Sequence, residues 1–192
     1  GWLEDMEAAI EELRRQSGNP RIVLVGLRFG ATLAALCAQR DPLRIAHLVL
    51  WDPVVRGDQY LQELAGMHLA YMNEELGQRA VAPANEADKR FPAEALGMPI
   101  SDALATQIEG IDIATRLPPT RHITIINSRP STDLERLRGG WQACPALRWI
   151  DVMESSSWNS DAALNSALVP AKEIASIVTG VMECSPQSRG TG

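Results

Sequence analysis

Residues 22–36, IVLVGLRFGATLAAL, indicate the fold of this chain more clearly than any other stretch. The first residues are aliphatic throughout, which is typical of a strand buried on both faces of a parallel sheet. A pair of glycines, Gly26 and Gly30, then leads into a run of small and aliphatic residues with helical character. We predict a strand at 21–25, a sharp turn and a helix at 31–40, the beginning of a right-handed β-α-β unit.

The turn between the glycines has the spacing of a nucleophile elbow, in which a strained central residue is flanked by glycines two positions away on either side. Gly26 and Gly30 match that steric demand, but the central residue is Arg28. A guanidinium stays protonated and has no lone pair with which to attack a carbonyl carbon. A plain tight turn of a doubly wound fold is an alternative interpretation. A dinucleotide site is a weaker one, because the spacing is not G-x-G-x-x-G.

Strand and helix patterns alternate along the rest of the chain. Further buried strands are predicted at 45–51, 122–127 and 147–153, and helices at 2–16, 59–76, 101–113, 132–141 and 171–182. This order predicts an α/β fold with a doubly wound, mostly parallel sheet. Ligands of such sheets bind beyond the carboxyl ends of the strands, so any chemistry is expected there.

Residues 57–117 interrupt the alternation and are interpreted as a helical cap inserted into the core. The predicted organisation is a core at 1–56, the cap at 57–117, a second part of the core at 118–183 and a disordered tail at 184–192. The chain begins at Gly1 directly in a helical pattern. We therefore expect the N-terminal strands of the sheet to be missing from this sequence, as in a fragment.

Composition excludes several classes of function. The 192 residues carry a net charge of -6 and no basic stripe, which argues against a nucleic-acid partner. Three widely spaced cysteines and no histidine at ligand spacing support neither a disulfide framework nor a metal site. No apolar run reaches the length of a membrane span and no leader pattern is present, so we expect a cytoplasmic protein without a cofactor.

Two segments resemble a known family. LVGLRFGATLAAL at 24–36 and IAHLVLWDPVVRGDQYLQEL at 45–64 resemble the α/β-hydrolase superfamily, in its serine aminopeptidase-like branch. Within that branch they look most similar to the exosortase-system-associated hydrolases, and EALGMPISDALATQIEGIDI at 94–113 resembles the return from cap to core in that group. The resemblance covers about residues 1–182 and corresponds to the later two-thirds of such a protein.

The resemblance implies equivalents for the catalytic triad of that family. Arg28 stands at the nucleophile position, and the amide of Phe29 stands at the position of an oxyanion-hole donor. Asp133, or Asp52 as in some members, stands where the acid belongs. The loop expected to supply the histidine contains Trp158 and no histidine. Two of the three triad members are therefore expected to be absent.

The remaining histidines and serines do not restore a triad by pattern. His47 and His68 lie within predicted elements and His122 begins a strand, so each is interpreted as structural. Serines in the loop at 155–157 would need a base within hydrogen-bond reach, and the sequence offers none. A serine nucleophile there is thus the weaker hypothesis.

Arg28 itself has two compatible interpretations. A cation beside the positive end of a helix needs a compensating anion. Asp52 or Asp133 can supply it as an internal ion pair. Alternatively, a bound carboxylate or phosphate can accept from the guanidinium together with the amides of Phe29 and Gly30.

Two groups of aromatic and apolar residues also have alternative interpretations. Trp51 and Trp149 are predicted to be core residues, whereas Trp158 is open to a role facing a ligand. The cap helix carries apolar side chains that either form a lid over an acyl ligand or simply pack the cap on the core: Tyr60, Leu61, Leu64, Met67, Leu69, Tyr71 and Met72.

The sequence therefore favours a hydrolase-fold protein with an altered site that binds a small anionic or acyl ligand. The alternative is an active esterase, thioesterase or peptidase-like hydrolase completed by residues outside this chain. A second alternative, implied only by the resemblance, is a scaffold that binds a protein partner in an exosortase and polysaccharide-export system.

Overall fold

The computed structural model describes residues 1–40, 45–76, 93–152 and 171–183. These residues form two compact units, one from Gly1–Val54 with Ile113–Gly192 and the other from Val55–Asp112. The predictions for Trp158, for the serines at 155–157 and for the tail at 184–192 concern residues outside the described ranges.

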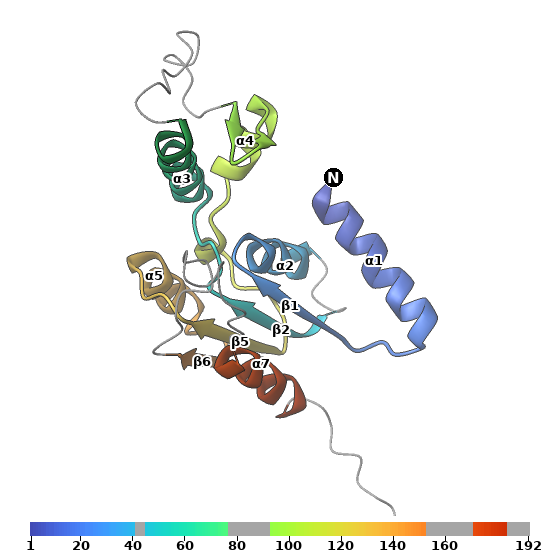
Figure 1. Cartoon of the computed structure of the whole chain (residues 1–192). Helices are drawn as coiled ribbons and strands as arrows, with labels where there is room; N and C mark the ends of the chain where they lie inside the picture. The colour runs from blue at the N-terminus through green and yellow to red at the C-terminus, as the bar shows by residue number, and fades with distance from the viewer. Residues whose placement is uncertain (41–44, 77–92, 153–170, 184–192) are drawn as a thin grey trace, which may run out of the picture. The chain divides into compact units, whose positions relative to one another are not determined.

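The first unit contains a parallel sheet of four strands in the order β1-β2-β5-β6 (Figure 1). The strands are β1 (Ile22–Leu27), β2 (Ile45–Trp51), β5 (His122–Asn127) and β6 (Leu147–Asp151). Among the described residues, the α-helices of this unit are α1 (Trp2–Ser17), α2 (Phe29–Arg40), α5 (Thr132–Trp141) and α7 (Ala171–Glu183). The predicted doubly wound parallel sheet is confirmed, and its central strand β2 has the predicted bounds.

The helices cover the sheet from both sides, with α2 and α7 on opposite faces (Figure 1). Because side chains alternate along a strand, Val49 and Trp51 point to one face and pack with Ile126. Ile177 and Val181 of α7 pack against that cluster. The core of this unit therefore lies on the two central strands, between the helix layers.

Strand β1 departs from its prediction. Its residues alternate between buried and exposed, and Val25 is 52% exposed, with Val23 and Leu27 exposed on the same face. The expectation of a strand buried on both faces is wrong for β1 in this structure. The reason is position, because β1 is the edge strand and α7 contacts β2 and β5.

The second unit is built on α3 (Gly57–Leu76), which packs on α4 (Asp102–Glu109). An antiparallel bridge between Arg56 and Asp112 joins the two ends of this unit's chain segment. Beside that bridge, a Cβ on Gly57 would lie 1.6 Å from the carbonyl oxygen of Ile108, so only glycine fits there.

Two details of this unit differ from the sequence-based expectations. The helix predicted at 101–113 begins after Ser101, whose hydroxyl accepts from Leu104 N–H at 3.2 Å, but it ends at Glu109. Gly110 follows, and the Ile111 N–H bonds back to Ile108 at 3.0 Å, a tighter turn that stops the α-helix. A short hairpin of β3 (Glu94–Ala95) and β4 (Met98–Pro99) was not predicted.

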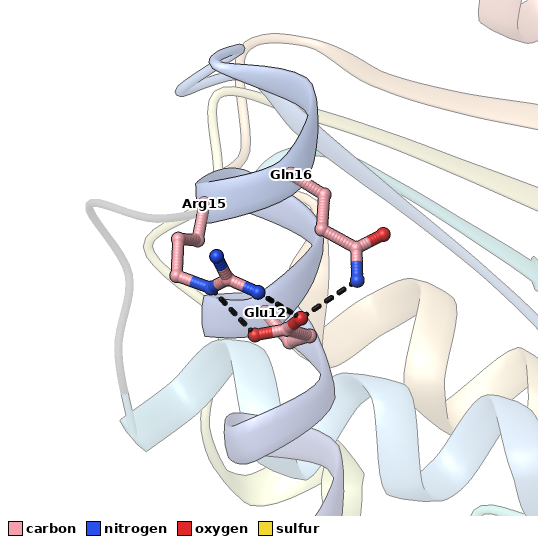
Figure 2. A network of polar contacts seen from close by, with 3 residues as sticks. All are labelled: Glu12, Arg15 and Gln16. Carbon is pink, nitrogen blue, oxygen red and sulfur yellow. Dashed lines mark hydrogen bonds and ion pairs between the residues drawn. The ribbon is translucent and has the colours of Figure 1, made fainter.

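Helix α1 is amphipathic and ends at Gly18, which has φ 64°. On its exposed face, one carboxylate gathers two neighbours: Glu12 accepts from Arg15 Nε at 2.9 Å and from Gln16 Nε2 at 2.6 Å (Figure 2). The hydrogen bonds from Arg15 and Gln16 both lower the pKa of Glu12, and the bond from Arg15 has the larger effect. Such exposed pairs stabilise a helix only slightly, so the effect of this network is confined to α1.

In the described ranges, no helix combines the length and apolar character that crossing a bilayer requires.

Candidate functional site at the carboxyl edge of the sheet

Arg28 occupies a strained turn between β1 and α2. Its φ is 52°, a left-handed conformation that non-glycine residues rarely adopt. A Cβ on Gly26 would lie 2.4 Å from Cα of Ala31, so the strand and the helix approach each other too closely for any side chain there. A Cβ on Gly30 would meet no atom within 4 Å, so the expected steric demand for glycine does not hold at that position.

Backbone hydrogen bonds hold this turn against the neighbouring strand. The Arg28 N–H donates to the carbonyl of Trp51 at 2.9 Å, and the Arg28 carbonyl accepts from Ala31 N–H at 3.0 Å. The hydroxyl of Thr32 donates to the carbonyl of Val54 at 2.6 Å. The strained conformation, which costs about 1–3 kcal/mol, is thus imposed by the packing around it.

Asp52 is the second strained residue, at the end of β2. It has φ 42° and is 1% exposed. Its carboxylate accepts from the backbone N–H of Ser128 at 2.8 Å and also from the Ser128 hydroxyl. The same hydroxyl oxygen accepts from Trp51 Nε1 at 3.3 Å. Asp52 therefore binds the turn after β5, and Ser128 is a site residue that the sequence patterns had not distinguished from its neighbours.

A third polar group lies at the ends of β5 and β6. Asn127 donates from Nδ2 to Asp151 Oδ1 at 2.8 Å, and Trp149 donates from Nε1 to the same oxygen at 3.0 Å. The Arg138 guanidinium lies 5.3 Å from the centre of the Trp149 ring. Trp149 is half-buried, so its prediction as a core residue is wrong, whereas Trp51 is buried as predicted.

The other residues singled out by sequence are placed as follows. Phe29 is the first residue of α2, and its ring makes an edge contact with Trp2, with centroids 5.9 Å apart. Asp133 is half-buried in the first turn of α5, next to Ser131, whose hydroxyl caps that helix. The Asp52 carboxylate accepts from the backbone N–H and from the hydroxyl of Ser128, and the proposed pairing of Arg28 with Asp52 or Asp133 stays a prediction.

The histidines of the first unit lie away from this edge. His47 is buried in β2, and its Nε2 lies 2.9 Å from the hydroxyl of Thr124. Burial, together with the neighbouring His122, lowers the pKa of His47 to about 4, so the ring is neutral at physiological pH. His122 begins β5 at the amino edge of the sheet. In the described part of this unit, no histidine stands beside Arg28 as a base.

One buried carboxylate was missed by sequence reasoning. Glu173, in the first turn of α7, is 1% exposed, and its Oε1 has no hydrogen-bond partner among the residues that the structure describes. A Cβ on Gly180 of the same helix would lie 3.5 Å from the Thr124 hydroxyl, which places the later turns of α7 over the middle of the sheet. An acid near a helix start is a common sequence signal, but only packing reveals that this one is buried.

The residues that the structure describes contain no candidate metal site, because no three or more His, Cys, Asp or Glu side chains are grouped so that they could hold an ion. Cys37 and Cys144 are buried, and neither forms a disulfide. The charged residues that the structure describes at the carboxyl edge include Arg28 after β1, Arg129 after β5, and the carboxylates Asp52 and Asp151, which accept hydrogen bonds.

Comparison with known proteins supports the fold. No protein-family model matches the chain, and no curated protein matches it. Among solved structures, VinJ has a TM-score of 0.57 at 14% identity, over 94% of this chain and 72% of its own. A carboxylesterase structure from the thaumarchaeon Nitrososphaera gargenis has a TM-score of 0.54 at 12% identity, over 94% of this chain and 71% of its own.

An esterase of Pyrococcus furiosus has a TM-score of 0.53 at 13% identity, and this chain spans 60% of its length. At such low identity, the likeness concerns the fold alone. The chain has the α/β-hydrolase fold, with a four-stranded sheet that corresponds to part of the larger proteins.

Proposed function

We propose that this protein binds a small anionic ligand, a carboxylate or an acyl compound with an anionic group, at the Arg28 turn. One observation carries the proposal: Arg28 holds a left-handed φ of 52° in a turn where Gly26 is pressed onto the backbone of Ala31. This geometry presents a residue at the carboxyl edge of the sheet, where ligands of open α/β folds bind.

Electrostatics favours an anion over a neutral ligand at this position. The first amides of a helix precede any carbonyl of that helix that could accept from them, and they give the helix start a partial positive charge. Arg28 adds a full positive charge immediately before α2. A carboxylate can accept from a guanidinium in a bidentate manner and from the amides of Phe29 and Gly30 at the same time.

The alternative is a serine-type hydrolase, favoured by the names of two similar structures, which are esterases. Arg28 cannot act as a nucleophile. The described histidines of the sheet, His47 and His122, lie near the amino ends of β2 and β5. Hydrolysis would therefore need a nucleophile and a base from outside the described residues. A scaffold role in an exosortase system rests on the sequence resemblance alone and ranks third.

Calorimetric titration with sodium butyrate and sodium hexanoate tests anion binding. We expect saturable binding that weakens at least about tenfold in Arg28→Gln, because a charge-assisted hydrogen bond contributes roughly 1.5–3 kcal/mol. Arg121→Gln removes the same charge beside the amino end of β5 and is the matched control. Equal affinities in the two variants, or no binding to the wild type, would contradict the proposal.

A fluorophosphonate probe distinguishes the alternative. Absence of labelling in the wild type agrees with binding without serine chemistry. Labelling of the wild type would show a reactive serine that the described residues do not provide, and the hydrolase alternative would then take first place. Arg28→Ser, treated in parallel, tests whether the turn can present a nucleophile when one is supplied.

A further inference from the structure

The hairpin β3–β4 in the second unit is short and strained. Each strand has two residues, and the two residues between them, Leu96 and Gly97, have φ of 51° and 81°. Positive φ at both central positions is the geometry of a type I′ turn, whose first position favours Asn, Asp or Gly. A leucine is unfavourable at this position, so the turn destabilises the hairpin.

Burial compensates little of that cost. Leu96 and Met98 are 43% and 68% exposed, whereas Ala95 is the buried residue of the hairpin. An isolated hairpin of two strands is marginal in water even without strain. The hairpin therefore depends on its attachment to the helix against which β3 packs, α3.

A hydrogen bond from backbone to side chain makes that attachment. The N–H of Leu96, at the strained position itself, donates to Nδ1 of His68 on α3 at 3.1 Å. Because the backbone group is the donor, Nδ1 must carry a lone pair, and the neutral ring holds its proton on Nε2. A protonated imidazole has donors on both nitrogens and cannot make this bond.

We propose that His68 is a pH-sensitive latch for the β3–β4 hairpin. While the imidazole is neutral, Nδ1 accepts from Leu96 and holds the strained turn on α3. When the ring is protonated, two N–H groups face each other, the bond is lost and the strained hairpin is released.

The described charged groups on the elements packed around His68 are carboxylates. Within one turn along α3, the neighbours of His68 at three and four positions are Leu64, Ala65, Tyr71 and Met72. The charged side chain of the hairpin is Glu94, and α4, which also packs on α3, carries Asp102 and Glu109. The variant His68→Asn keeps these carboxylates, so a transition that is lost in this variant is assigned to the ring.

Amide hydrogen exchange at Leu96, followed by NMR between pH 8 and pH 5 and corrected for intrinsic exchange, tests the latch. We expect the protection factor of this amide to fall about 5- to 10-fold on acidification, the loss of one hydrogen bond. In His68→Asn, Oδ1 takes the place of Nδ1 as an acceptor that does not titrate, and protection should be independent of pH.

Two further variants make the result decisive. Leu96→Asn relieves the strain of the turn and should retain more protection at pH 5 than the wild type. His122→Asn removes a histidine of the first unit and should leave the transition unchanged. Protection that does not change with pH in the wild type, or a transition that persists in His68→Asn, would overturn the latch.

Discussion

At the scale of single residues, two glycines with similar roles in the sequence have different roles in the structure. A Cβ at Gly26 would meet the backbone of Ala31 at 2.4 Å, whereas a Cβ at Gly30 would meet nothing within 4 Å. Backbone atoms cannot move aside as a flexible side chain can, so the close approach at Gly26 is essential to the turn that presents Arg28.

The matched pair Gly26→Ala and Gly30→Ala should therefore separate clearly. Gly26→Ala is expected to destabilise the fold by roughly 3 kcal/mol, through overpacking and displacement of α2. Gly30→Ala, in the first turn of α2, is expected to be neutral or to stabilise by about 0.5–1 kcal/mol, because alanine loses less backbone entropy. Urea denaturation of both variants measures the difference, and similar stabilities would contradict the geometry.

His47 makes the stability depend on pH. Its folded pKa of about 4 lies below the ordinary value of 6.5, so the folded state binds fewer protons than the unfolded state. Its contribution to stability is therefore complete above pH 6.5 and declines as the pH falls toward 4, by at most about 1.4 kcal/mol per pH unit.

The comparison with His47→Gln isolates this contribution, because the carboxylates common to both proteins cancel. We expect the free energy of unfolding of the wild type, measured relative to the variant, to decrease between pH 7 and pH 5. A difference that stays constant over that range would show that the ring is as easily protonated in the folded chain as in the unfolded one.

At the scale of elements, α7 combines good apolar packing on the sheet with one buried carboxylate that is incompletely hydrogen-bonded among the described residues. Ile177 and Val181 pack on the cluster of Val49, Trp51 and Ile126, as an amphipathic helix should. Glu173 is buried in the same helix, and within the described ranges one oxygen of its carboxylate lacks a hydrogen-bond partner. Buried polar groups without partners are destabilising, so α7 is held by its apolar contacts in spite of this residue.

Replacing Glu173 by Met should therefore stabilise the protein by about 1–3 kcal/mol, the desolvation penalty of an unsatisfied polar group. Glu135→Met, at an exposed position in the first turn of α5, is the matched control and should change stability by less than about 0.5 kcal/mol. Thermal unfolding in parallel measures both. A loss of stability in Glu173→Met would show that the carboxylate has a necessary partner.

At the scale of the whole molecule, the sheet is covered unevenly. The central strands are buried by helices, but β1, at the edge of the sheet that the structure describes, has three apolar side chains exposed on one face: Val23, Val25 and Leu27. An edge strand of this kind offers both unpaired backbone groups and apolar surface to other chains, which favours association.

Val25→Lys should therefore reduce self-association of this chain, since a lysine on an edge strand opposes pairing. Leu69→Lys, a similar change at an exposed position of α3, is the control and should have little effect. Light scattering across a concentration series measures the average mass. If the wild type is monomeric throughout, the edge does not mediate association under those conditions.

The sequence alone determined the order and type of the main elements, because its hydrophobic periods and its Gly and Pro boundaries are local signals. Strands β2 and β5 and helix α5 have the predicted bounds. It also located the turn at Arg28, since glycine spacing next to a buried strand is readable without tertiary contacts.

Only the tertiary structure decided what depends on distant neighbours. The exposure of Val25 follows from the position of β1 at the edge, and the burial of Glu173 follows from the docking of α7. The bonds of Asp52 to Ser128 and of Leu96 to His68 join residues far apart in sequence. Hydrophobic periodicity predicts which face of an element is apolar. Packing decides which side chains of different elements contact each other, and the candidate site consists of such contacts.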